Sequence, residues 1–88
     1  MDKLRLVNMA SDLMLKQVYS DLEIDVLLKN LEDGSFGIIL THLDDRYEYG
    51  NNALRIYDWQ SESKIMKTFE YMKEVIAGER LITDEWET

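Results

Sequence analysis

Apolar residues recur at helical spacing between residues 61 and 78. Spacings of four, three and four residues place them on one stripe of an α-helix, with charged residues mostly on the other side. The stripe consists of Ile65, Phe69, Met72 and Ile76. Ser61 can accept a hydrogen bond from the first turn, and Gly78 can adopt the left-handed conformation that ends a helix. We therefore predict an amphipathic helix here, whose apolar side the rest of the chain must cover.

Residues 2–19 show a second helical pattern, for which Asp2 is a plausible N-cap. The apolar residues that share its face are Leu6, Val7, Ala10, Leu13, Met14 and Val18. Leu4 and Leu6 also alternate around Arg5, so a short strand followed by a helix capped by Ser11 is an alternative. We favour one helix, because the apolar face continues through Ala10.

Residues 20–33 fit two structures. As a helix, Ser20 and Glu23 have capping-box spacing, and a stripe of four apolar residues follows. As a strand, apolar and polar residues alternate from Leu22 to Lys29, and Asp33-Gly34 is a strong hairpin turn. We favour the helix and keep the strand as the alternative.

Residues 36–59 are typical of an antiparallel β-meander. Residues 36–40 and 53–59 are rich in strand-forming side chains, and Tyr47 and Tyr49 alternate with Glu48 between them. Asp44-Asp45 and residues 50–52 are the expected turns. The predicted fold is α+β: one domain over residues 1–88, with one or two N-terminal helices, about three strands, a C-terminal helix on the sheet and an acidic tail at 79–88.

The charge is concentrated in part of the chain. The formal net charge is −8, and residues 20–62 hold ten acidic residues against three basic ones. Residues 79–88 hold four acidic residues and one basic one. This charge disfavours binding to nucleic-acid phosphates or to an anionic membrane, and it favours a basic partner.

The same composition bounds the location and the covalent chemistry. The chain has no cysteine, so a disulfide, a thiolate metal site and a cysteine nucleophile are excluded. The sequence lacks an apolar run of membrane-spanning length and a signal-peptide pattern. We expect a cytoplasmic protein.

The candidate chemistry is sparse. His42 is the single histidine, followed by Asp44 and Asp45, but the sequence gives it no recognisable nucleophile. We expect a half-exposed strand histidine rather than a catalytic one. The acidic residues match no EF-hand spacing, and no glycine-rich phosphate loop is present, so we expect neither a metal site nor a cofactor.

The aromatic residues suggest two uses. Tyr47, Tyr49, Tyr57 and Trp59 could line one face of the sheet, either as a protein-binding face with a charged rim or as cover for the core. Trp86, between two glutamates near the end, is either part of a frayed tail or the anchor of an acidic docking peptide.

Binding of a basic protein through the acidic loops is the leading hypothesis. Clustered carboxylates can imitate the spacing of phosphates and accelerate association with a basic surface. The expected contacts are Glu32, Asp33, Asp44, Asp45 and Glu48, with Tyr47 and Tyr49. The alternative is a small structural or assembly protein, for example a homo-oligomer, whose acidity serves only solubility.

The size, the acidity and the passage from a strand through a polar cap into a helix (IYDWQSESKIMKTFEYM, residues 56–72) resemble those of small phage-encoded anti-defence proteins. Among them are anti-CRISPR proteins that occupy the nucleic-acid channel of an effector nuclease. The resemblance covers mainly residues 20–78 and carries over no site residue. It implies a non-enzymatic inhibitor with a basic protein partner and no cofactor.

Overall fold

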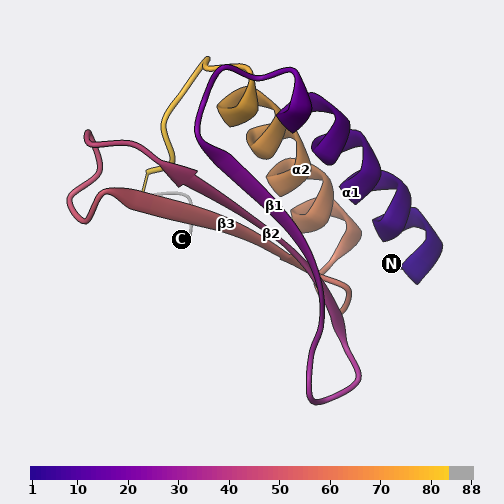
Figure 1. Ribbon diagram of the computed structural model, residues 1–88. Helices are drawn as coiled ribbons and strands as arrows, with labels where there is room; N and C mark the ends of the chain where they lie inside the picture. The colour runs from indigo at the N-terminus through magenta and orange to yellow at the C-terminus, as the bar shows by residue number, and fades with distance from the viewer. Residues whose placement is uncertain (84–88) are drawn as a thin grey trace.

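The computed structural model describes residues 1–83, which form two layers (Figure 1). Two helices lie side by side on one face of a three-stranded antiparallel sheet of order β1-β2-β3. The elements in chain order are α1 (Lys3–Val18), β1 (Ile24–Asn30), β2 (Phe36–Leu43), β3 (Asn51–Tyr57) and α2 (Glu62–Ile76). The predicted α+β class, with a meander and a C-terminal helix on the sheet, is confirmed.

Helix α1 is one uninterrupted helix, as favoured from the sequence. The Asp2 carboxylate accepts a hydrogen bond from the backbone N–H of Arg5 at 2.9 Å and caps the first turn. Leu6, Ala10 and Leu13 are buried, whereas Val18 is 75% exposed. The side of α1 that enters the core is therefore narrower than the apolar pattern suggested, and a second set of apolar residues remains at the surface.

Helix α2 has the ends predicted from its sequence. The Ser61 hydroxyl accepts a hydrogen bond from the N–H of Lys64 at 3.1 Å, and Gly78 beyond the helix has a φ of +78°. All four residues of the predicted stripe are buried, and Thr68, Tyr71 and Val75 are buried beside them.

The favoured helix over residues 20–33 was wrong, because residues 24–30 form strand β1. The strand pattern prevails because residues 24–30 pair with β2 along their whole length. The turn that joins the two strands suits this pairing: Gly34 has a φ of +86°, and the Asp33 carboxylate accepts hydrogen bonds from Ser35. The Ser20 hydroxyl is not part of a capping box. It donates to the carbonyl of Ile76 at 2.9 Å and ties the start of this segment to the end of α2.

The sheet buries one face only. Ile38 pairs with Leu28 on β1 and with Ile56 on β3, and these side chains lie on the face that the helices cover. Ile39 belongs to the opposite face, opposite Leu27 and Arg55. No element among residues 1–83 covers this opposite face (Figure 1).

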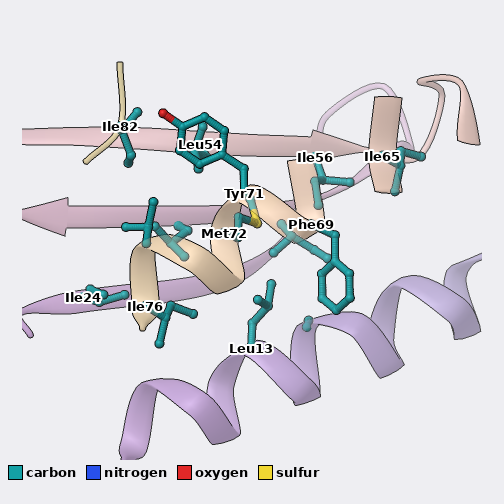
Figure 2. Close-up of a cluster of buried hydrophobic side chains, with 14 of the residues drawn as sticks. Leu13, Ile24, Leu54, Ile56, Ile65, Phe69, Tyr71, Met72, Ile76 and Ile82 are labelled. Atoms are coloured by element: carbon teal, nitrogen blue, oxygen red, sulfur yellow. The ribbon is translucent and has the colours of Figure 1, made fainter. Parts of the chain in front are cut away.

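The core joins all five elements (Figure 2). Leu13 of α1 points toward Phe69 and Met72 of α2, and Ile56 of β3 lies on their other side. Ile82, beyond α2, is 5% exposed and completes the core. Within the described part of the chain, no helix combines the length and apolar character needed to cross a membrane.

Candidate partner-binding surface

The five acidic residues expected to contact a partner are divided between two ends of the sheet. Glu32 and Asp33 lie in the turn between β1 and β2, and Asp44, Asp45 and Glu48 lie in the loop between β2 and β3. The two connections are separated by β2, whose eight residues span about 25 Å. A partner of ordinary interface size would therefore be centred either on the turn between β1 and β2 or on the loop between β2 and β3, and not on both.

The loop between β2 and β3 has further acidic neighbours that the sequence analysis did not select. The backbone N–H of Leu43 donates to the carbonyl of Glu23 at 2.9 Å, which brings the segment before β1 beside this loop. The end of α2 is joined to the same segment through Ser20 and Ile76. We call this group the acidic pole: Asp21, Glu23, Asp44, Asp45, Glu48 and Glu79.

Two arginines lie near the acidic pole, and each is engaged. Arg46 forms a two-pronged ion pair with Asp44, with N–O distances of 2.9 and 2.7 Å, and Arg80 pairs with Glu74 at 3.1 Å. For residues 1–83, the structure gives no ion pair to the other acidic residues of the pole, which are exposed: Asp21, Glu23, Asp45, Glu48 and Glu79. These five carboxylates are available to a basic partner.

Asp44 has a structural part in the loop. Its carboxylate accepts hydrogen bonds from the side chain of Arg46 and, at 2.9 Å, from the backbone N–H of the same residue. These bonds hold the pKa of Asp44 well below its usual range. The loop is closed further by Gly50, whose φ is +80° and whose carbonyl accepts from the N–H of Asp44 at 3.0 Å. The Asp44–Arg46 pair therefore fixes the loop that presents Asp45 and Glu48.

His42 lies beneath the acidic pole and is 2% exposed, so the expectation of a half-exposed histidine was wrong. Its position on β2 turns it toward the helices, and the ring of Tyr47 folds back over it edge-on. The Tyr47 hydroxyl lies 2.8 Å from Nδ1 of His42 and accepts the N–H of Ile82 at 2.9 Å. The other ring nitrogen of His42, Nε2, lies 3.8 Å from the Asp44 carboxylate.

Burial lowers the pKa of His42 and raises that of Tyr47, because it disfavours the charged form of each group. Burial therefore favours a neutral imidazole and a neutral phenol in this pair. The ring of His42 is closed off from solvent, and the contacts of the pair join β2, the loop and the segment after α2. The pair thus stabilises the surface above it.

The four aromatic residues do not line one face. Tyr47 is buried against His42, whereas Tyr49 in the same loop is 83% exposed. Tyr57 and Trp59 stack with ring centroids 5.4 Å apart, and Tyr57 pairs with Gly37 near the opposite end of the sheet. Tyr49 is therefore the one aromatic residue of this set that can act as an anchor at the acidic pole. Trp86 lies outside the described residues.

A groove of about 630 Å³ between the C-terminal halves of α1 and α2 opens beside the acidic pole. Its apolar lining includes Leu15, Tyr19, Leu22 and Ile76, with Asp21 at its rim. The signal that could have indicated it is Leu15, an apolar residue of α1 that lies outside the core-facing stripe. The structure describes no cluster of three or more potential metal-ligating side chains in residues 1–83.

Comparison with protein-family models, with curated proteins and with solved structures gave no match to this chain.

Proposed function

We propose that this chain is a non-enzymatic binding module that engages a basic protein surface through its acidic pole. The observation that carries the proposal is the gathering of Asp21, Glu23, Asp45, Glu48 and Glu79 at one end of the fold without ion-pair partners among the described residues. Such a concentration of one charge accelerates encounter with a basic surface and selects against acidic ones.

The rigidity of the loop supports this role. Asp44, held by Arg46, and Tyr47, held by His42, fix the backbone on either side of Asp45. Carboxylates that are already positioned lose less conformational freedom on binding than carboxylates on a mobile loop. The exposed Tyr49 adds an aromatic side chain of the kind that is enriched at binding hot spots.

The partner class follows from the charge. A surface that binds clustered carboxylates is one that also binds phosphates, so we propose a nucleic-acid-binding protein as the partner. An effector nuclease of a CRISPR system is the specific case that the resemblance to anti-defence proteins implies. Glu32 and Asp33, at the other end of the sheet, are outside this contact.

The test is a pull-down from host lysate with tagged protein at low and at high salt. The double variant D45K/E48K should lose a partner that wild type recovers at low salt, because the two lysines repel a basic surface that the two carboxylates attract. Wild type itself should lose the partner at high salt, because salt screens contacts between exposed charges. The variant E32K/E70K is the matched control: it makes the same change in net charge at sites away from the acidic pole, and it should retain the partner. Equal loss in both variants would show that net charge, not the acidic pole, determines binding.

The assembly role is a second candidate, and one observation favours it. The uncovered face of the sheet includes Leu27, which is 53% exposed, and the half-buried Ile39. A partner that stays bound at high salt, or recovery of the protein alone, would support this candidate over the first.

A further inference from the structure

Strand β1 is an edge strand, and the hydrogen bonds at its two ends show which backbone groups point outward. Glu23 accepts from Leu43 and Leu31 donates to the carbonyl of Ser35, so odd-numbered residues of this strand bond to β2. The even-numbered residues direct their N–H and C=O groups away from the sheet. They are Ile24, Val26, Leu28 and Asn30.

The other edge, β3, is partly blocked. Its outward N–H groups at Ala53 and Tyr57 donate to the side chains of Asn52 and Gln60, at 2.8 and 3.0 Å. Such side-chain bonds occupy donors that another strand would need.

The β1 edge is blocked at one end only. The side-chain amide of Gln17 donates to the carbonyl of Ile24 at 2.7 Å. Across residues 1–83, no hydrogen bond reaches the outward groups of Val26 and Leu28. The centre of β1 is therefore open to a further strand.

Three side chains of β1 lie on the uncovered face of the sheet. In chain order they are negatively charged, apolar and positively charged: Asp25, Leu27 and Lys29. Their partners on β2 are Thr41, Ile39 and Gly37, so neither charge has an opposite charge beside it within the sheet. A charge on an edge strand usually opposes strand pairing. Here the two opposite charges lie two positions either side of Leu27, which makes this edge complementary to itself.

We infer that two copies of this chain associate through β1, antiparallel, about an axis at Leu27. In this register Asp25 lies opposite the partner's Lys29, and Leu27 lies opposite its own counterpart. Val26 and the partner's Leu28 then form a hydrogen-bonded pair, because both direct their backbone groups outward. A shift of the register by two residues would lose both opposite-charge pairs.

The adjoining side of α1 suits the same contact. Arg5 forms an ion pair with Glu62 of α2, and Lys16 lines the groove between α1 and α2. These two residues therefore mark the side of α1 that faces α2. At 100° per residue, Val7 and Val18 lie on the opposite side, toward the β1 edge. They are 37% and 75% exposed. Pairing of β1 with a second copy would bring these apolar sides of the two α1 helices together.

The arrangement places the two acidic poles at opposite ends of one continuous sheet, because the paired strands run antiparallel. The association does not depend on the acidic pole, and its failure leaves that proposal untouched.

Sedimentation velocity tests the pairing from low micromolar to submillimolar concentration. Wild type should dimerise with rising concentration. D25K and K29D should each weaken dimerisation by about tenfold or more, since two opposite-charge pairs become like-charge pairs. An equimolar mixture of D25K and K29D should recover the dimer, because each variant then supplies the charge that the other needs. The control R55E reverses a charge on β3 of the same face and should dimerise as wild type does.

Two results would overturn the inference. One is a wild type that stays monomeric at every concentration, which would leave the edge to a strand of another protein. The other is a dimer that D25K and K29D do not weaken, which would place the interface elsewhere. Recovery in the mixture also excludes misfolding as the cause of the loss in the single variants.

Discussion

The hydroxyl of Tyr47 and Nδ1 of His42 form a hydrogen bond of 2.8 Å in the interior of the protein. The same hydroxyl accepts the backbone N–H of Ile82, so it joins β2 to the segment that follows α2. The acidic pole is thus built above a buried neutral pair, and its shape depends on that pair.

Removal of the Tyr47 hydroxyl should therefore destabilise the fold. In Y47F, the N–H of Ile82 loses its acceptor in a buried site, which costs about 1–3 kcal/mol. Urea unfolding followed by circular dichroism measures the loss. Y49F removes the same atom from a side chain that is 83% exposed and should change the free energy of unfolding by less than about 0.5 kcal/mol. Equal effects in the two variants would contradict the importance of the buried contact.

The stability should also depend on pH through His42. Burial lowers its pKa in the folded state below the unfolded value of about 6.5, so protonation favours unfolding. This contribution is fully present above about pH 6.5 and is lost as the pH falls through the folded pKa. Wild type should lose more stability between about pH 7.5 and about pH 5.5 than H42Q, whose side chain can still hydrogen-bond to Tyr47 but does not titrate. Parallel pH profiles of the two proteins would refute this.

Substitution of two leucines of α1 tests which side of this helix packs into the core. Leu13 is fully buried and Leu15 is 59% exposed. L13A should lower the free energy of unfolding by about 2–5 kcal/mol, because it removes buried methyl groups and leaves a cavity. L15A, the same change on the same helix, should cost less than about 0.5 kcal/mol. The midpoints of urea unfolding compare them directly, and a loss in L15A as large as that in L13A would mean that the groove side of α1 is packed.

The parts of the fold that were predictable depend on neighbours in sequence. The ends of α2 follow from Ser61 and Gly78, which act on the helix beside them. Residues 20–33 satisfied both a helical and a strand period, and a neighbour distant in sequence decided between them: β2, which pairs with Val26 and Leu28 along their length. No local pattern contains that information.

The candidate site was predictable only in part for the same reason. Sequence proximity grouped Glu32 with Asp44, although β2 separates them. Glu23 joins the loop through a backbone bond to Leu43, a contact across 20 residues of chain that composition cannot reveal. The prediction of a half-exposed His42 was wrong because its cover, Tyr47, comes from a loop that folds back over the strand, which the sequence does not show.

The most direct test of the acidic pole is a titration of the isotope-labelled protein with an arginine-rich peptide, followed by amide chemical shifts. The largest changes should fall on residues 21–23 and 44–49, with little change at Glu32 and Asp33. Salt should abolish them, since the screening length falls from about 10 Å at 0.1 M to about 3 Å at 1 M. Equal changes at the turn between β1 and β2, or changes that persist in high salt, would contradict the acidic pole as the binding surface.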